Sequence, residues 1–431
     1  MVRERIEVLL SHRYFVPGCM AAGIVLRLLW IWLVRADQVS DFAWYYDRGM
    51  DIAAGRGYSV NGIRTAYWPA GYPLFLGGLF YLFGPMQLLG KLANVVLSTA
   101  TIWMSYLLAK RVFHSEHAGR IAVCLLAFYP NQTAFVSVLS TEILFQCLFL
   151  LGAVLFVFAQ GRPGWIALSG AVWGLATLTK TQAVIVPIIF LLVFMWKERA
   201  MLKTGILVYT AVLLVCAPWL VRNYLIFGKP LLSTNGGIVL MIGNNPYATG
   251  RQIWDQRVQS LLGDLGVEES QIFDGRELAR EERAKQVASD YIANHPGRVL
   301  LFLWPRKLVA TYLSDVDGFY YSLGMVKNHN RLWQAAYLGF RIFAELYYLA
   351  ILALFAFAIP TIVRSNVRCY RIGLFLVAYF TLVYLVYFGN ARYHFALMPW
   401  ITIYAAIGAE RVLKKGWSGE KMGADPNLAA S

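Results

Sequence analysis

The sequence predicts an all-α protein that crosses a membrane about ten times. Its 431 residues are 58% hydrophobic and their mean hydropathy is +0.53, whereas soluble globular proteins are about 45–50% apolar. Several apolar runs reach the roughly 17–25 residues that a helix needs to cross the hydrocarbon core. The net charge of +15 comes mostly from basic residues between these runs. This distribution favours topology signals and contact with anionic headgroups over nucleic-acid binding.

The apolar runs place the expected spans along the chain. The first is about Phe15–Val34; it lacks a small-x-small cleavage site and is followed by Arg35 and Asp37. We therefore interpret it as an uncleaved signal anchor. The others are expected at about 88–109, 119–138, 141–159, 165–179, 181–196, 204–221, 333–359, 371–388 and 393–411.

The apolar piece Leu74–Phe83 decides the parity of the topology. It is short for a span, and short apolar runs are often interfacial or re-entrant. If it does not cross, the basic connectors fall on the side of the amino-terminal arginines, as the positive-inside rule requires. These connectors contain Lys110, Arg111, Arg120, Arg162, Lys197, Arg199, Lys203, Arg364, Arg368, Arg371, Arg411, Lys414 and Lys415. We therefore predict an interfacial or re-entrant segment at 72–84 and both termini in the cytoplasm. The short loops and the absence of a lumenal domain favour a bacterial inner membrane.

The predicted spans divide the chain into four parts. These are an N-terminal transmembrane module (1–221) that includes the first outer loop (35–87), an extracytoplasmic loop region (222–331), C-terminal transmembrane helices (332–412) and a cytoplasmic tail (413–431). Within the loop region we expect a charged helix near Glu277–Asn294. The run VLLFLWPRKLVATYL that follows is amphipathic and interrupted by Pro305, which is typical of a helix lying along the outer surface.

Polar side chains gather at the outer ends of the predicted spans, and we expect them to form one site. Ionisable groups at membrane depth are costly, so they tend to face one another or a hydrated cavity and to mark function. Many come from the first outer loop, which reads ADQVSDFAWYYDRGMDIAAGRGYSVNGIRTAYWPAGYP from Ala36. The candidate site residues are Asp41, Tyr45, Tyr46, Arg64, Tyr67, Glu142, Lys180, Arg222, Arg392, Tyr393 and His394.

Asp41 is the residue that we expect to act as a general base. A carboxylate beside a pocket that the bilayer shields can remove a proton from a hydroxyl. The alternative is an N-cap for a helix that begins at Phe42, since Asp is a favoured cap. Asp47 and Asp51 follow at near-helical spacing, and for them a solvated face or pairing with Arg48 is favoured.

Other ionisable candidates lie further along the chain. Glu142 opens an otherwise apolar helix and needs a partner or water; a capping box would require Ser or Thr where Leu139 stands. Arg392 and Lys180 suit a lipid phosphate, the arginine as a bidentate fork and the lysine as a point charge. Their alternative is snorkelling to headgroups. For His394, a hydrogen-bonded packing role is favoured over a proton shuttle.

The order of the motifs resembles a known family. SDFAWYYDRGMDIAAGRGY follows the first span, then come YWPAGYPLFLGGLFYLFG, YP with STE, GLATLTK, PWLVRNYLIFG and GNARYHFALMP. Over about residues 10–412 the chain resembles the GT-C membrane glycosyltransferases, in particular bacterial relatives of dolichyl-phosphate-mannose protein mannosyltransferases. The lipid A aminoarabinose and galacturonic acid transferases belong to the same broad group.

The resemblance implies an extracytoplasmic active site and a sugar donor carried on a polyprenyl phosphate. Asp41, the acidic residue after the first helix, would be the catalytic acid/base group in an inverting transfer, and Glu142 is the second catalytic candidate. Lys180 stands where many relatives have arginine, and with Arg392 and Arg222 it would stabilise the leaving phosphate. Because a lipid phosphate is a good leaving group, no metal and no other cofactor is expected.

Two further features bear on the substrate. Tyr45, Tyr46, Tyr67 and Trp68 can stack on the sugar or close over the prenyl chain, or else form an interfacial aromatic belt. Protein mannosyltransferases and aminoarabinose transferases usually have an Asp-Glu pair in the first loop, whereas here Phe42 follows Asp41. The acceptor, which can be protein, lipid A or another glycan, therefore stays open.

Two alternatives to a glycosyltransferase remain. A transporter or flippase would place coupling acids near mid-bilayer and often shows inverted repeats, whereas here the acids concentrate at one face, with Arg27 the exception inside the first span. A polysaccharide polymerase or ligase would place its key residues chiefly in the late outer loop. The five cysteines show neither metal-ligand spacing nor a disulfide framework, and the glycine turns follow no strand, which argues against a nucleotide loop.

Overall fold

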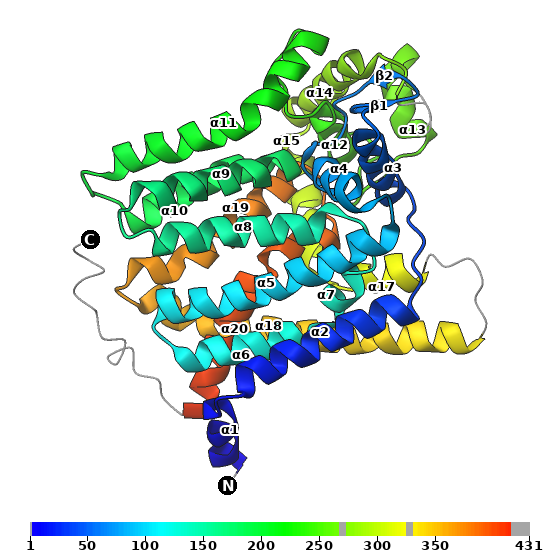
Figure 1. Cartoon of the computed structure of the whole chain (residues 1–431). Helices are drawn as coiled ribbons and strands as arrows, with labels where there is room; N and C mark the ends of the chain where they lie inside the picture. Colours follow the sequence, from blue (N-terminus) through cyan, green and yellow to red (C-terminus); the bar gives the residue numbers. More distant parts are fainter. Residues whose placement is uncertain (1, 267–272, 325–330, 415–431) are drawn as a thin grey trace.

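Long helices lying side by side make up most of the computed structural model (Figure 1), which describes residues 2–266, 273–324 and 331–414. They are α2 (Phe15–Leu33), α5 (Gln87–Phe113), α8 (Thr141–Phe158), α9 (Pro163–Thr179), α11 (Met201–Phe227), α18 (Arg331–Arg364), α19 (Ile372–Val386) and α20 (Met398–Lys414). Shorter helices α6 (Glu116–Ala127), α7 (Pro130–Phe135) and α10 (Val186–Phe194) lie among them, and α1 (Val2–Ser11) precedes them. The predicted all-α class is confirmed.

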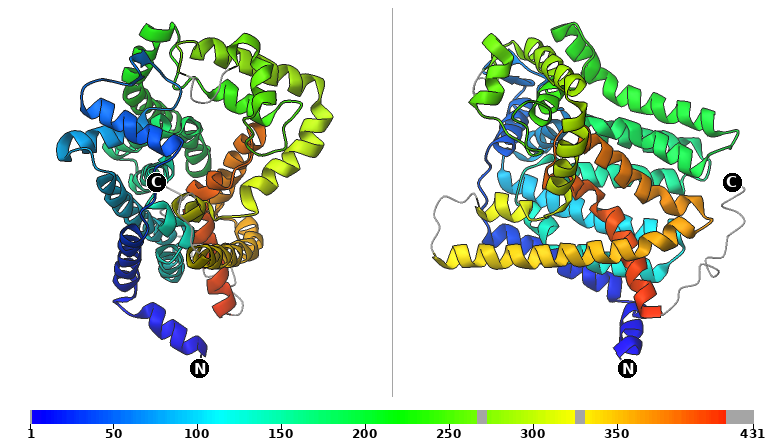
Figure 2. Two further views of the ribbon diagram at one scale, coloured as in Figure 1. Left: turned by 90° about the vertical axis from the view of Figure 1, so that its right-hand side faces the viewer. Right: turned by 180° about the vertical axis from the view of Figure 1, so that it is seen from behind.

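A group of short elements covers one end of the bundle, which we call the capped end (Figures 1 and 2). It contains α3 (Asp41–Ala53), the hairpin of β1 (Ser59–Val60) and β2 (Ile63–Arg64), α4 (Gly71–Phe83), α12 (Gly236–Gly243), α13 (Gln256–Gln259), α14 (Glu277–Asn294), α15 (Pro296–Arg298), α16 (Trp304–Tyr312) and α17 (Asp317–Phe319). Helix α4 packs on α3 at this end and does not run through the bundle, as predicted for 72–84.

Six of the described helices are long and apolar enough to cross a membrane, by length and composition alone. They are Phe15–Leu33, Gln87–Phe113, Thr141–Phe158, Met201–Phe227, Gln334–Arg364 and Arg368–Val386. Each coincides with one of the ten predicted spans. The other four predicted spans also fall on helical structure, but those helices are shorter or interrupted, so the number ten stays a prediction.

The predicted span 119–138 is interrupted. Helix α6 ends at Ala127, the chain turns through Phe128 and Tyr129, and α7 then begins with Pro130 in its first turn. Proline has no N–H to donate and its ring clashes with the preceding turn, so it starts a helix readily but does not continue one. The last predicted span is likewise shortened, because Ala391–Leu397 forms a 3₁₀ helix, η7, before α20 begins.

The end opposite the cap, which we call the connector end, holds the short connections α5–α6, α8–α9, α10–α11 and α18–α19, as well as α1 and the last described turn of α20 (Figure 1). The predicted basic connectors lie here, except that Lys415 falls outside the described residues. The predicted tail 413–431 falls outside the described residues from 415 onward. The cytoplasmic location that the positive-inside rule assigns to these connectors stays a prediction.

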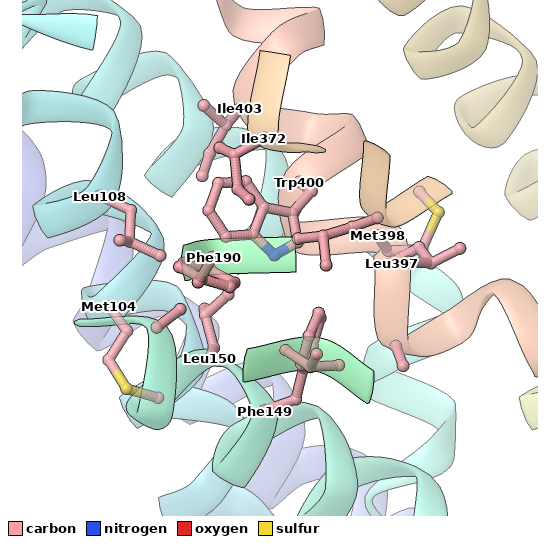
Figure 3. Close-up of a cluster of buried hydrophobic side chains, with 14 of the residues drawn as sticks. Met104, Leu108, Phe149, Leu150, Phe190, Ile372, Leu397, Met398, Trp400 and Ile403 are labelled. Atoms are coloured by element: carbon pink, nitrogen blue, oxygen red, sulfur yellow. The ribbon is translucent and has the colours of Figure 1, made fainter. Parts of the chain in front are cut away.

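Apolar side chains fill the centre of the bundle. Figure 3 shows one cluster of them, in which Trp400 lies among residues from α5, α8, α10 and α19. Trp400 and Phe190 are completely buried and their ring centroids are 6.3 Å apart. Large apolar side chains also cover the outside of the long helices, for example Trp32, Leu214 and Leu346. Such extensive exposed apolar surface is the mark of contact with lipid.

The structure explains the arginine inside the first span. Arg27 is completely buried in α2. Its guanidinium donates to Ala127 O at 2.8 Å, to Leu126 O at 3.1 Å and to Ser98 Oγ at 2.7 Å. The two carbonyls end α6, where the helix has no intrahelical donors left and carries the negative end of its dipole. Arg27 therefore fastens α2 and α5 to the carboxyl end of α6.

We expect Arg27→Met to lower the free energy of unfolding by about 1.5–3 kcal/mol, since hydrogen bonds to a charged group are lost and buried carbonyls stay unpaired. Unfolding of the purified protein in detergent measures this. Arg35→Met is the matched control, because Arg35 is exposed just after the same helix. Equal effects of the two changes would contradict this account of Arg27.

The two outer segments are fastened to each other at the capped end. Glu277, the first residue of α14, accepts hydrogen bonds from Thr65 Oγ1 at 2.7 Å and from Ala66 N at 2.8 Å. Arg222, near the end of α11, donates to the carbonyls of Thr65 and Tyr58 at 2.7 and 2.8 Å. The stretch after the β-hairpin is therefore held between α11 and α14, and the residues that follow it are directed toward the bundle.

Candidate active site

Four ionisable residues from distant parts of the chain meet at the capped end. Arg392 Nη2 lies 3.1 Å from Asp41 Oδ2, and Lys180 Nζ lies 3.1 Å from Glu142 Oε1. Arg392 Nε is a further 4.0 Å from the same Glu142 oxygen. We call these four residues the charged cluster. It consists of two carboxylates and two cations in alternation.

Local structure positions each member of the charged cluster. Asp41 is the first residue of α3, and Ser40 before it has φ +48°, a left-handed conformation that is strained for a residue with a side chain. The alternative role, an N-cap, is not the one observed, because Asp41 lies inside the helix and faces Arg392. Asn390 accepts a hydrogen bond from the backbone N–H of Arg392 at 3.1 Å and so fixes the start of η7.

The remaining two members lie at helix ends. Glu142 is in the first turn of α8 and its side chain is 4% exposed. Lys180 follows the last residue of α9 in an extended conformation, so its side chain leaves the helix direction and reaches Glu142. Burial lowers the pKa of Lys180, and the carboxylate of Glu142 opposes this change. Glu142 thus has the partner that its apolar helix requires, and Lys180 is held in an ion pair with it.

The charged cluster forms part of the lining of a cavity of about 390 Å³. Of the predicted site residues, those that line it are Asp41, Tyr45, Tyr67, Glu142, Lys180, Arg392 and Tyr393. The rest of the lining is uncharged. Its aromatic rings come from the first outer loop, from the segment after α12, and from α19 and the residues after it, whereas α12 itself contributes apolar side chains. Such a cavity, with convergent polar groups and aromatic walls, has the features of a small-molecule site.

Four predicted site residues lie elsewhere. Tyr46 packs its ring on Phe80 and directs its hydroxyl to a backbone carbonyl. Arg64 is exposed on β2. Arg222 is engaged by the backbone of the first outer loop, as described above, and stacks on Trp219 at 4.6 Å. None of the three lines the cavity in the described structure. Backbone and aromatic partners hold Tyr46 and Arg222, and Arg64 faces outward.

His394 is the fourth, and it is a packing residue, as favoured from the sequence. It is completely buried, and its Nδ1 lies 2.6 Å from the carbonyl of Thr311 while its Nε2 lies 3.1 Å from Asp315 Oδ1. The rings of Tyr312 and Tyr348 stack on it. Burial lowers the pKa of His394, but the carboxylate of Asp315 more than offsets this and the net effect is a raised pKa. Both ring nitrogens face oxygen atoms, so the imidazolium form fits the site.

This geometry predicts a pH-dependent contribution to stability. Because the folded pKa of His394 is raised above the unfolded value of about 6.5, its contribution is fully present below about pH 6.5 and is lost as the pH rises through the folded pKa. We expect the unfolding free energy of the wild type to fall as the pH rises above about 6.5. In His394→Gln, the share of this decrease that comes from His394 should be absent.

Chemical denaturation in detergent across the pH range measures this difference. His114→Asn is the control, because His114 is exposed and asparagine tolerates its left-handed backbone (φ +51°). The same pH dependence in wild type and His394→Gln would contradict the assignment.

Some residues of the site region are not among the sequence candidates. Asp315 is buried beneath η7 and accepts from Tyr129 and Asn131 as well as contacting His394. Asn235 and Trp254 line the cavity from the second outer segment. The asparagine stands in the turn-rich run STNGG, where Asn is commonplace, so the sequence carries no signal that separates it from a loop residue. Asp51, by contrast, pairs with Arg48 at 2.7 Å as predicted.

Comparisons with known proteins agree with the predicted resemblance. Residues 68–221 match the model of the dolichyl-phosphate-mannose-protein mannosyltransferase family. The oligosaccharyltransferase of Archaeoglobus fulgidus in its apo form superposes with a TM-score of 0.55 at 11% identity, over 94% of this chain and 51% of that one. AglB from the same organism, in complex with an inhibitory peptide and a dolichol-phosphate, gives 0.51 at 12% identity, over 93% and 50%.

A further structure in the comparison is ArnT from Cupriavidus metallidurans bound to undecaprenyl phosphate, with a TM-score of 0.42 at 14% identity, over 93% of this chain and 77% of that one. A search of curated proteins by sequence finds no match. The chain spans about half the length of the oligosaccharyltransferases it resembles. The fold is that of the GT-C membrane glycosyltransferases, and the chain is an integral membrane protein.

Proposed function

We propose that this protein is a membrane glycosyltransferase that moves a sugar from a polyprenyl-phosphate carrier to an acceptor hydroxyl at the capped end. The observation that carries the proposal is the charged cluster, which puts two carboxylates and two cations within one cavity of the GT-C fold. The capped end is taken as the extracytoplasmic face, because the basic connectors lie at the other end. The acceptor is a protein, lipid A or a glycan.

The cluster has the charges that this reaction needs. A polyprenyl-phosphate sugar is a phosphodiester with one negative charge, and departure of the sugar leaves a monoester that gains a second charge. Arg392 and Lys180 lie where they can stabilise that growing charge in a partly buried site. Burial lowers the pKa of Arg392, but the two carboxylates more than compensate, so its pKa lies well above the ordinary value and it stays charged.

Asp41 is the proposed general base. In the absence of donor it is held by Arg392. When a phosphate takes the guanidinium, Asp41 becomes free to accept the proton of the acceptor hydroxyl. The acceptor oxygen then forms a bond to the anomeric carbon as the bond from that carbon to the phosphate oxygen breaks, with inversion. Glu142 stays with Lys180 and keeps both cations in place, so its role is to position them.

Release of free polyprenyl phosphate tests the proposal. Purified protein in lipid vesicles is incubated with a panel of polyprenyl-phosphate sugars and with a cell-envelope extract as the source of acceptors. We expect release that depends on the protein with at least one sugar, and that Arg392→Gln abolishes. A panel without protein-dependent release, in the presence of acceptor, would overturn the proposal.

A further inference from the structure

We propose that the cavity wall formed by residues 233–254 contains a subsite for an uncharged sugar ring, whose hydroxyls bind the side-chain amide of Asn235. This inference rests on the proposed glycosyl transfer and names the class of sugar that the site accepts. The subsite consists of Asn235 and Ser233 as hydrogen-bonding groups and Trp254 as an apolar neighbour, all of which line the cavity.

Asn235 is the principal observation. The residue is 8% exposed, and it lines the cavity. Within the described residues no hydrogen bond joins its amide to another protein group. An amide offers two donors and an acceptor, and those of Asn235 stay accessible at the cavity surface, since they are not among the enclosed, unpaired polar atoms of the described residues. A hydroxyl of a sugar ring both donates and accepts, so a sugar supplies the missing partner.

The amide of Asn235 is free because a residue from another helix caps α12 in its place. Asn235 stands at the N-cap position of α12, and Asn is among the favoured capping residues, yet its side chain makes no capping bond. Glu281 of α14 caps the helix instead, since Gly237 N donates to Glu281 Oε2 at 2.6 Å. A Cβ on Gly237 would lie 2.2 Å from the carbonyl oxygen of Glu281, so glycine permits this close packing.

Charge then limits the sugar to an uncharged one. All ionisable acids and bases that line the cavity belong to the charged cluster, with tyrosines the further titratable groups. Its members already form two ion pairs. A uronic acid would need another cation and an amino sugar another carboxylate, because a buried charge without a partner is costly. The wall around Asn235 offers only hydroxyl, amide and apolar groups, which suit a neutral ring.

The test compares undecaprenyl phosphate carrying glucose, galacturonic acid or 4-amino-4-deoxyarabinose. We expect turnover of the neutral donor with a kcat/KM at least tenfold above either charged one. Asn235→Ala should raise KM for the neutral sugar roughly three- to tenfold with little change in kcat, as loss of one neutral hydrogen bond implies. Asn294→Ala is the matched control, since Asn294 is exposed at the end of α14. A preference for a charged donor, or an unchanged KM in Asn235→Ala, would overturn the subsite.

Variants of Glu281 separate a positioning effect from misfolding. Glu281→Ala removes the cap of α12, so Asn235 should turn to cap its own helix and KM should rise as in Asn235→Ala. Glu281→Gln keeps an oxygen that accepts from Gly237 N and should restore KM to near the wild-type value. A loss of kcat with unchanged KM in Glu281→Ala would count against the arrangement.

Two further measurements test the subsite separately from the proposed function. If KM rises for the acceptor glycan and not for the lipid donor, the neutral ring that Asn235 binds belongs to the acceptor. If no donor turns over, the transfer proposal fails, and saturation-transfer NMR with methyl glucoside and methyl glucuronide tests the subsite alone. Binding of the glucoside that Asn235→Ala weakens would support the subsite, whereas absence of binding would overturn it.

Discussion

Asp41→Asn should lower kcat for sugar transfer by about 10²–10⁴-fold, the usual contribution of a positioned general base. Asparagine keeps the shape of the side chain and can still contact Arg392, but it cannot take the proton of an acceptor hydroxyl. KM for the donor should change little, because Arg392 and Lys180 remain to bind the phosphate. Release of polyprenyl phosphate under saturating donor gives kcat directly.

Asp47→Asn is the matched control for this prediction. Asp47 lies on the same helix, α3, but is exposed and does not line the cavity. It should leave kcat within about twofold of the wild type, as most surface substitutions do. A wild-type kcat in Asp41→Asn, or an equal loss in both variants, would remove Asp41 from the role of base.

Glu142→Ala should lower the free energy of unfolding by about 3–5 kcal/mol, the cost of removing one partner from a buried ion pair. The side chain of Glu142 is 4% exposed and that of Lys180 is 15% exposed, so water replaces the lost carboxylate poorly. Arg392, whose Nε lies 4.0 Å from Glu142, loses part of its compensation as well. Thermal or chemical unfolding in detergent measures the change.

A second pair of variants supports this interpretation. The double variant Glu142→Gln, Lys180→Gln lacks both charges of the buried pair. It should be more stable than the Glu142→Ala variant, since no uncompensated charge then remains at Lys180. Glu282→Ala is the control, because Glu282 pairs with Lys229 on the surface with both side chains about half exposed, and such pairs contribute about 0–1 kcal/mol. Equal losses in Glu142→Ala and Glu282→Ala would contradict the buried role.

For the charged cluster, the sequence predicts where its members lie but not how they pair. Asp41, Glu142, Lys180 and Arg392 are separated by up to 351 residues, yet helix parity and the basic connectors predict that all four lie at the same end of the bundle. That prediction needs only element order, because helices that alternate in direction bring alternate ends together. Which acid pairs with which cation depends on side-chain geometry and is not available from the pattern.

Other residues show where sequence reasoning stops. His394 follows the cavity residue Tyr393 in the chain, but its side chain is directed toward Asp315. Arg222 is directed toward the backbone of the first outer loop. Asn235 has the local pattern of a helix cap, and only the packing of Glu281 from α14 frees it. In each case a tertiary contact overrides the local signal, so the direction of the side chain has to come from the structure.

Transfer of a doubly labelled donor tests the central claim most directly. The sugar and the polyprenyl phosphate carry different isotopes, and both are followed in vesicles that contain the protein and acceptor. The account predicts that one sugar appears on the acceptor for each polyprenyl phosphate released, and that Asp41→Asn stops both together. Donor that crosses the membrane with its sugar still attached, at the same rate in wild type and Asp41→Asn, would contradict glycosyl transfer and would identify a transporter.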